Sequence, residues 1–377
     1  MLEITGTYNK AKVFTDQLDP SAEGQIRALC SQPFAIGSKI RIMPDVHAGK
    51  GCTIGTTMTI GNQVVPNLVG VDIGCGMETV QIKAKRLELP KLDSFIRQNI
   101  PSGREIRQQP HRSHENIDLS ALRCAEKIDL RRAAESLGTL GGGNHFIEID
   151  QNGDTLYLVI HTGSRNPGRK VAEYYQNRAY EQLGGRKQTE VPYELAYLTG
   201  QDLEDYLHDM AIMQNFASLN RQIIKEVILS GMKWKEEGSI STIHNYIDME
   251  SGILRKGAVS AKQGETLLIP MNMRDGSLIC TGLGNDDWNC SAPHGAGRLM
   301  NRSEAAASFT VSAFKKEMKG IYTTSVSSDT LDECPMAYKP MEEIMKHIAP
   351  TVKIDCIIRP VYNFKASENA GGKRQRG

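Results

Sequence analysis

The stretch GVDIGCGM, residues 70–77, places a carboxylate and a thiol three residues apart in a loop that contains three glycines. Glycine lets the backbone turn tightly, so the side chains of Asp72 and Cys75 can point to one spot. None of the eight cysteines forms a C-x-x-C pair with another, which argues against a zinc ribbon or a thioredoxin-type site. The pair is a candidate for metal binding. From this loop alone, a buried apolar thiol beside an Asp turn cap fits about as well.

Five of the nine histidines share one kind of setting, beside Gly, Asn or Pro and mostly at the end of a predicted strand. Loops on a rigid sheet are where functional residues concentrate. One such histidine would more often be structural, but five in the same context favour one shared site. They are His47, His145, His161, His244 and His294.

Imidazole, thiolate and carboxylate ligands together suit a borderline divalent ion such as Mn, Fe, Co, Ni or Zn, and they disfavour a pure Mg or Ca site. Five such ligands are too many for one tetrahedral ion and suit two ions that share a bridging ligand. Two-metal sites commonly serve phosphoryl transfer. The candidate ligands are Asp72, Cys75, His145, His161 and His244.

Two glycine-containing stretches could hold phosphate groups, because glycine lets the backbone approach phosphate oxygens and arginine binds them in a bidentate fork. HGAGR, residues 294–298, places a histidine in a turn with Arg298 behind it. Each stretch alone is a weak signal, and the Rossmann and Walker A patterns are absent from the expected strand–helix contexts. The second stretch, HTGSRNPGRK, offers backbone amides with Ser164, Arg165, Asn166, Arg169 and Lys170.

The elements that would position these residues are mixed. Runs of Val, Ile and Thr between glycines predict strands over the first 80 residues and again over 240–284. Two further strands flank the hairpin signal DQNGD and carry the motifs of His145 and His161. Apolar spacing predicts helices at 91–99, 119–136 and 201–236, a helix at 303–319 with Ser303 as N-cap, and one after Pro340.

We therefore expect an α+β fold: a single large mixed domain over residues 1–377, with β-sheets that carry a loop-built two-metal site and helices on their flanks. No linker or repeat divides the chain, and residues 366–377 are expected to form a loose basic tail. Scattered cysteines, no evident secretory signal and no long apolar window indicate a cytoplasmic protein without a membrane segment. The net charge of +1 means that any nucleic acid must bind a local patch.

Seven motifs now stand in order over residues 43–339: MPDVHAGKGCTIG, GVDIGCGM, LGGGNHFIEI, HTGSRN, HNY, HGAGR and CPMAYK. Together they resemble the RtcB family of GTP-dependent RNA ligases, and seven in series make the resemblance specific. It implies an enzyme that joins RNA 3′-phosphate or 2′,3′-cyclic phosphate ends to 5′-hydroxyl ends, in RNA repair or tRNA splicing. It also implies GTP, two Mn²⁺ ions and, in many members, an archease-type activating protein.

The resemblance implies a role for each matching residue. Cys75 would bridge the two ions, with Asp72 and His145 on one ion and His161 and His244 on the other. His294 would be the nucleophile that is guanylylated before GMP passes to the RNA; a largely neutral imidazole can attack without a base. The implied nucleotide contacts are Asn144, Phe146, Glu148, Asn245, Ser277, Ala296, Gly297, Tyr338 and Lys365.

The chain departs from the family pattern in one loop, where the usual PGxMG reads PMNMRDGS over 270–277. This change bears on how the nucleotide is positioned. Two other functions use the same residues: a two-metal phosphodiesterase or phosphatase acting on cyclic phosphate ends, which would not need His294, and a non-catalytic RNA-binding protein. For His47 of PDVH, an orienting role and a structural hydrogen bond remain open.

Overall fold

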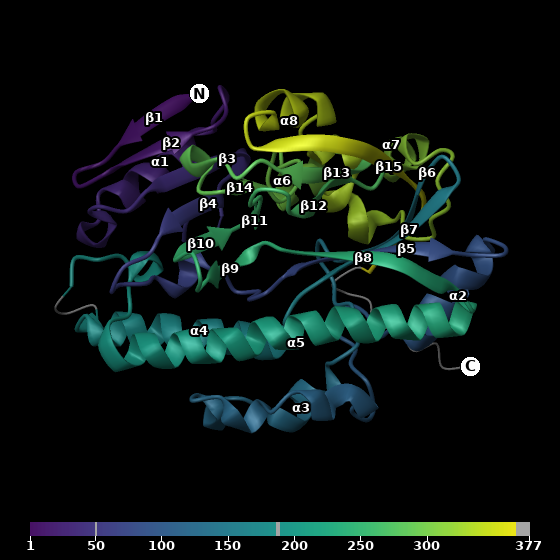
Figure 1. Cartoon of the computed structure of the whole chain (residues 1–377), viewed down its shortest axis with the longest axis horizontal. Coiled ribbons are helices and arrows are strands. Elements are labelled where there is room, and N and C mark those ends of the chain that lie inside the picture. The colour runs from purple at the N-terminus through teal and green to yellow at the C-terminus, as the bar shows by residue number, and fades with distance from the viewer. Residues whose placement is uncertain (50, 186–188, 367–377) are drawn as a thin grey trace.

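The computed structural model describes residues 1–49, 51–185 and 189–366. The N-terminal part forms a six-stranded sheet in the order β1-β2-β3-β4-β10-β9 (Figure 1). Only the β2–β3 pair is parallel. Helix α1 (Pro20–Cys30), which begins after the N-cap Asp19, packs against β1, β2 and β3. The strands are Leu2–Thr5, Lys10–Val13, Ile40–His47, Ile54–Thr59, Ile253–Lys256 and Asn245–Asp248.

The second sheet has seven antiparallel strands in the order β12-β13-β15-β6-β7-β5-β8. Its two edge strands lie close together: the Leu268 amide on β12 donates to Thr242 Oγ1 on β8 at 3.2 Å. The sheet therefore curls around an apolar interior that includes Met77, Val159 and Ile358. Its strands are Thr266–Asn272, Gly276–Gly282, Val352–Lys365, Phe146–Asn152, Thr155–Thr162, Gly76–Lys83 and Lys235–Ile243.

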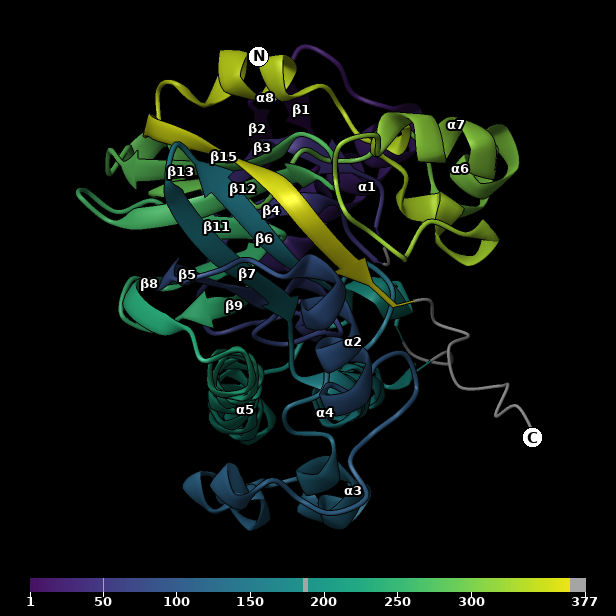
Figure 2. The same cartoon turned by 90° about the vertical axis from the view of Figure 1, so that its right-hand side faces the viewer.

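One side of the sheets is covered by helices. Helix α5 (Gly200–Met232) runs along this side, with α4 (Arg165–Gln182) and α2 (Leu89–Asn99) beside it and α3 (Leu130–Glu135) beyond them (Figures 1 and 2). Residues of α4 and α5, among them Tyr175, Met210 and Phe216, join the largest core cluster with the six-stranded sheet. Helix α5 ends where Lys233 takes a left-handed backbone with φ of 57°.

The short strands β11 (Ala258–Ser260) and β14 (Ser291–Pro293) pair with each other, and β11 contacts β4 of one sheet and β8 of the other. Helices α6 (Arg302–Ser308), α7 (Val311–Glu317) and α8 (Met341–Ile348) lie on the opposite side of the sheets, away from α5 (Figure 2). The cluster around Ile344 and Ile348 of α8 seals the outer face of β12 and β13. None of the described helices is both long and apolar enough to cross a bilayer.

The α+β fold with sheets flanked by helices is confirmed, as are the β6–β7 hairpin, the long helix α5, and helices α2 and α8. Three expectations were wrong. Only 130–135 of the predicted 119–136 helix is α-helical, because short 3-10 turns interrupt the rest. The predicted 303–319 helix is two helices, and its N-cap is Asn301, not Ser303, because Asn301 and Glu304 form a capping box. Helix α4 was not predicted.

The expectation for the C-terminal tail lies mainly outside the described residues. Of residues 366–377, the structure describes only Ala366, which is buried at 6% exposure against the second core cluster and is therefore not part of a loose tail.

Candidate metal centre and nucleotide pocket

Two groups of potential metal ligands meet where the seven-stranded sheet faces α5. One group consists of Asp72, Cys75 and His145, and the other of Cys75, His161 and His244. Within each group the ligand atoms all lie within 4.8 Å of one another, and Cys75 belongs to both. The structure thus brings together all five predicted ligands, in the two sets that the resemblance implies. Their role as ligands stays a prediction.

The loop that carries Asp72 and Cys75 is held tightly against its surroundings. Gly74 takes φ of 70°, and a Cβ there would lie 2.9 Å from the α5 backbone at Gln214. A Cβ on Gly163 would lie 2.3 Å from the Asp72 carboxylate. The same carboxylate accepts hydrogen bonds from the Ser164 amide at 2.9 Å and its hydroxyl at 3.2 Å, both through Oδ1. Asp72 is therefore fixed, and its Oδ2 faces His145.

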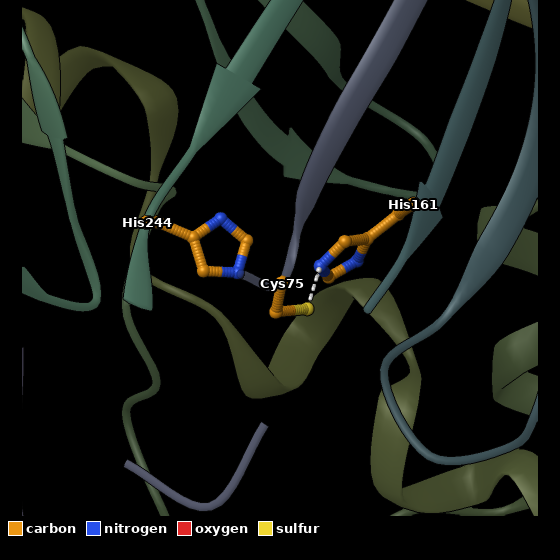
Figure 3. A group of neighbouring side chains, drawn as sticks. All are labelled: Cys75, His161 and His244. Carbon is orange, nitrogen blue, oxygen red and sulfur yellow. Dashed lines mark hydrogen bonds between the residues drawn. The ribbon is translucent and has the colours of Figure 1, made fainter. Parts of the chain in front are cut away.

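Two of the histidines have their tautomer set by backbone carbonyls. His145 Nδ1 lies 2.8 Å from the Leu140 carbonyl and His161 Nδ1 lies 3.0 Å from the Asn144 carbonyl. Because a carbonyl only accepts, each Nδ1 carries a proton, and this leaves His161 Nε2 with a lone pair. His145 Nε2 faces Asp72 Oδ2 at 3.1 Å, where it can donate to the carboxylate or, with an ion bound, offer its lone pair. His161 Nε2 lies 3.3 Å from Cys75 Sγ, and His244 approaches the same sulfur from the other side (Figure 3).

The charges of this cluster suit a cation. Burial and the neighbouring imidazoles hold the pKa of His161 and His244 well below the usual range, so both are neutral. Burial alone would raise the pKa of Asp72, but His145 and Arg165 together lower it to about 2. Carboxylate, sulfur and imidazole lone pairs therefore converge within a few ångströms. Burial and the Asp72 charge raise the pKa of Cys75, and a bound cation would reverse this by stabilising the thiolate. The donors fit a pair of borderline divalent ions.

His294 lies beside the second ligand group. Its ring centroid is 4.9 Å from that of His244. Its Nδ1 lies 2.6 Å from Oδ2 of Asp45, which is completely buried and also faces the His294 amide at 3.2 Å. A Cβ on Gly297 would lie 2.2 Å from the Asp45 carbonyl oxygen, so the HGAGR turn packs directly on β3. With Nδ1 engaged, Nε2 is the free nitrogen of His294. Asp45 was not among the predicted site residues.

A cavity of about 270 Å³ joins these groups. Of the fifteen predicted site residues, only His145 and Ser277 do not line it. Ser277 is fully buried in β13, where its hydroxyl has no hydrogen-bond partner among the described residues. The thirteen that line it are Asp72, Cys75, Asn144, Phe146, Glu148, His161, His244, Asn245, His294, Ala296, Gly297, Tyr338 and Lys365.

Part of the cavity lining is a charged network. Lys365 Nζ lies 2.6 Å from Glu333, and Arg298 and Arg302 contact the other oxygen of the same carboxylate at 3.3 and 3.0 Å. These cations overcome the effect of burial and hold the pKa of Glu333 at about 2. Glu333 and Arg302 line the cavity but were missed, although Glu333 directly precedes the CPMAYK motif.

The altered loop of the β12–β13 hairpin also lines the cavity, through Met271, Asn272 and Met273. Asn272 accepts from the amides of Arg274 and Asp275, which closes the turn. Arg274 contacts Glu317 of α7 and points its charge to that helix. His47, whose Nδ1 lies 3.1 Å from the Asp45 carbonyl, lines the cavity as well; this hydrogen bond agrees with the structural reading of His47.

The HTGSRNPGRK stretch was expected to bind phosphate, and the structure places it at the start of α4. Arg165 is held inward with φ of 56°, donating to Thr139 Oγ1 and to the Gly103 carbonyl, each at 3.2 Å. Arg169 and Lys170 are exposed and pair with Glu173. A second cavity of about 460 Å³ adjoins Asp72 and is lined by Arg104, Arg132, Arg165 and Arg169 among others.

Comparison with known proteins supplies the decisive observation. The family described as "tRNA-splicing ligase RtcB" matches residues 25–126 and 113–366. The chain belongs to the RtcB family. It is 31% identical to the RNA-splicing ligase RtcB of Escherichia coli K12, across 92% of this chain and 95% of that protein. It is 28% identical to the tRNA-splicing ligase RtcB of Aeropyrum pernix, across 85% and 86% of the two chains. The RNA-splicing ligase RtcB of Mycobacterium bovis is 27% identical, across 81% and 91%.

Proposed function

We propose that this chain is a GTP- and Mn²⁺-dependent RNA ligase that joins 3′-phosphate or 2′,3′-cyclic phosphate ends to 5′-hydroxyl ends, in RNA repair or tRNA splicing. Its membership of the RtcB family makes it an RNA ligase. The identity of the nucleotide, the metal and the RNA ends is the proposal. We further propose that residues 1–377 form one catalytic domain.

One observation carries the proposal: His294, backed by a buried carboxylate, opens into the same cavity as both ligand groups. A phosphodiesterase would need the ligands but no such histidine. In the Asp45–His294 pair, as in the triad of serine proteases, a buried carboxylate would orient an imidazole and stabilise the positive charge that develops on it. The part of the cavity lined by Lys365 and Glu148 would hold the guanine base.

In the first step, His294 Nε2 attacks the α-phosphorus of GTP. The nitrogen–phosphorus bond forms as the bond between that phosphorus and the bridging oxygen breaks, and pyrophosphate leaves with the electron pair. Nδ1 keeps its proton throughout and donates a hydrogen bond to Asp45, so the carboxylate stays paired with the positively charged imidazolium product.

The metal ions would be held by Asp72, Cys75 and His145 and by Cys75, His161 and His244. When bound, divalent ions at these positions would reduce the repulsion of the triphosphate and stabilise the departing pyrophosphate. The thiolate and imidazole donors disfavour Mg²⁺, and the choice of Mn²⁺ among the other divalent ions comes from the family.

In the later steps, an oxygen of the RNA 3′-phosphate takes the GMP from His294, which returns the free imidazole. The 5′-hydroxyl then attacks the same RNA phosphorus and loses its proton to solvent. The new phosphodiester bond forms as the bond from that phosphorus to the oxygen bridging to GMP breaks, and GMP leaves with the electron pair. An end that carries a 2′,3′-cyclic phosphate first needs one water to open the ring. We propose that the second cavity, next to Asp72 and rich in arginine, receives the RNA. An archease-type activator belongs to the proposal through the family alone.

The test is a ligation assay with two RNA strands, one ending in 3′-phosphate and one beginning with 5′-hydroxyl. We expect a joined product that requires both GTP and Mn²⁺ and is absent for His294→Ala. A strand that only loses its phosphate would instead establish a phosphatase. Binding of RNA without any turnover, with metal loaded and an activator supplied, would establish a non-catalytic binding protein.

A further inference from the structure

Helix α5 places two polar residues directly behind the ligand-bearing loops. Asn220 and Arg221 are both completely buried, and no proposed step uses either of them. Helix α5 packs against β5 and β7, the strands that follow Cys75 and contain His161 (Figure 1). A fully buried arginine is rare, because burying a charge costs free energy unless it is paired and hydrogen-bonded.

Arg221 connects the loop of Cys75 to the strand of His161. Its Nη1 donates to the Gly74 carbonyl and to the Thr162 carbonyl, each at 2.9 Å. Gly74 directly precedes Cys75, and Thr162 directly follows His161. One guanidinium nitrogen thereby sets the spacing of two ligands that belong to the same group and lie 3.3 Å apart at Cys75 Sγ and His161 Nε2.

Asn220 performs the same task for the other group. Its Oδ1 accepts from the amides of Gly138 and Thr139 at 2.7 and 3.0 Å. Its Nδ2 donates to the Thr139 and Gly163 carbonyls, each at 3.1 Å. The turn at 138–139 leads to Leu140, whose carbonyl fixes His145, and Gly163 packs on the Asp72 carboxylate.

Arg221 is not there to complete a local hydrogen-bond network. Its Nε and Nη2 have no hydrogen-bond partner among the described residues, an arrangement that destabilises a fold. No carboxylate of the described chain forms an ion pair with it within 4.0 Å. Burial lowers the pKa of Arg221, and negative charge on Cys75, Glu78 or Asp72 opposes that effect. Because burying these unpartnered donors destabilises the fold, we infer that Arg221 serves the site.

We propose that Asn220 and Arg221 are positioning residues that set the spacing between the two ligand groups, so that Cys75 can serve both ions. This inference rests on the metal centre of the proposed function. Cys75 and His161 are each next in sequence to a carbonyl that Arg221 holds. Asp72 packs on Gly163, and His145 is fixed by the loop that Asn220 holds. The fifth, His244, is tied to the same loop because its amide donates to the Cys75 carbonyl at 2.9 Å.

The test is metal binding by the whole chain, measured with Co²⁺ through its thiolate absorption band and with Mn²⁺ by titration. Arg221→Met removes the donors at similar length, and Arg221→Gln keeps amide donors without the charge. Partners that orient metal ligands typically contribute about 10- to 100-fold in affinity. We expect Arg221→Met to lose about that much and to show a weakened thiolate band, with Arg221→Gln in between.

The matched control is Ile228→Ala, a fully buried residue two turns along α5 that belongs to the second core cluster and has no side-chain group that could hydrogen-bond to a ligand loop. It should lower the melting temperature yet bind two Co²⁺ ions as the parent does. Parent affinity and band intensity in either folded Arg221 variant would overturn the proposal. The proposal would also be overturned if Ile228→Ala lost metal affinity together with stability, because general destabilisation would then explain the effect of the Arg221 variants. If neither Arg221 variant folds, Asn220→Ala decides in the same assay. A parent chain that binds no metal would instead contradict the proposed function.

Discussion

The Nδ1 atom of His294 lies 2.6 Å from Oδ2 of Asp45, a carboxylate with no exposure to solvent. The two residues are 249 positions apart, yet the backbone holds them together, because the HGAGR turn packs on β3. The pair leaves Nε2 as the only nitrogen of His294 that can react. In the proposed first step, Asp45 would therefore act as the positioning residue for His294.

Asp45→Asn should slow guanylylation while leaving the metals in place. The amide can present an N–H to Nδ1, which favours the wrong tautomer, and it cannot stabilise an imidazolium. The comparable change in a serine protease triad costs about 10⁴-fold, and we expect a loss of roughly 10²- to 10⁴-fold in the rate of GMP transfer to the protein. The measurement is the rate of radiolabel transfer from GTP at saturating Mn²⁺. A parent-like rate in a metal-loaded variant would show that Asp45 does not act on His294.

Cys75→Ala should weaken both metal positions, because its sulfur belongs to both ligand groups. Asp72→Ala should weaken chiefly the position that it shares with His145. Metal content per chain, measured after dialysis against Mn²⁺, should therefore fall from two toward zero in the first variant and toward one in the second. Gly163→Ala is a useful companion, since its Cβ would displace the Asp72 carboxylate and should mimic Asp72→Ala. Undiminished occupancy in Cys75→Ala is the result that rules out a bridging thiolate.

The residues that meet at the cavity were easier to predict than the scaffold around them. Motifs of Gly, His and Cys are local, so the five candidate ligands could be chosen from their neighbours, and the resemblance supplied the residues expected to contact the nucleotide. Asp45 could not, because its meaning depends on a contact 249 residues away. Helix α4 was missed because Gly168 and Pro167 in its first turn look like a loop, although proline is tolerated there. The 303–319 helix was overextended, because the extended backbone at Phe309 and Thr310 has no signal in apolar spacing.

GTP affinity should rise with pH through Glu148. Burial raises the pKa of this carboxyl to about 7, against the opposing effects of Asn363 and Lys365, and burial likewise raises that of the neighbouring Asp150. Below about 7 the group is protonated and accepts poorly from the N–H groups of guanine, so affinity should gain up to about tenfold per pH unit there and then level off.

The stability of the chain without GTP should fall, not rise, as the pH increases. A raised carboxyl pKa stabilises the fold at low pH, and this contribution is lost between the ordinary value of 4.5 and about 7. Calorimetric titration of GTP from pH 6 to 8 measures the first effect, and Glu148→Gln is the control that should bind independently of pH over this range. A parent chain whose affinity is flat across the range would exclude Glu148 as a titrating contact.

Arg165→Ala should slow sealing more than guanylylation, because Arg165 lines the second cavity beside Asp72 and not the nucleotide cavity. The double change Arg169→Ala with Lys170→Ala should mainly weaken RNA binding and flatten its salt dependence. The effect should be modest, since both side chains already pair with Glu173. Ligation and GMP transfer are measured side by side over a salt series. If all variants behave as the parent at every salt concentration, the RNA follows another path.

The most direct measurement is mass spectrometry of the intact chain after incubation with GTP and Mn²⁺, followed by mapping of the modified peptide. We expect one GMP per chain, attached to His294, which is lost in His294→Ala and transferred when RNA with a 3′-phosphate is added. The His294→Ala variant should keep its metals and still seal RNA that already carries a 3′-guanylyl end. No adduct on a folded, metal-loaded chain, or an adduct on any other residue, would contradict the account.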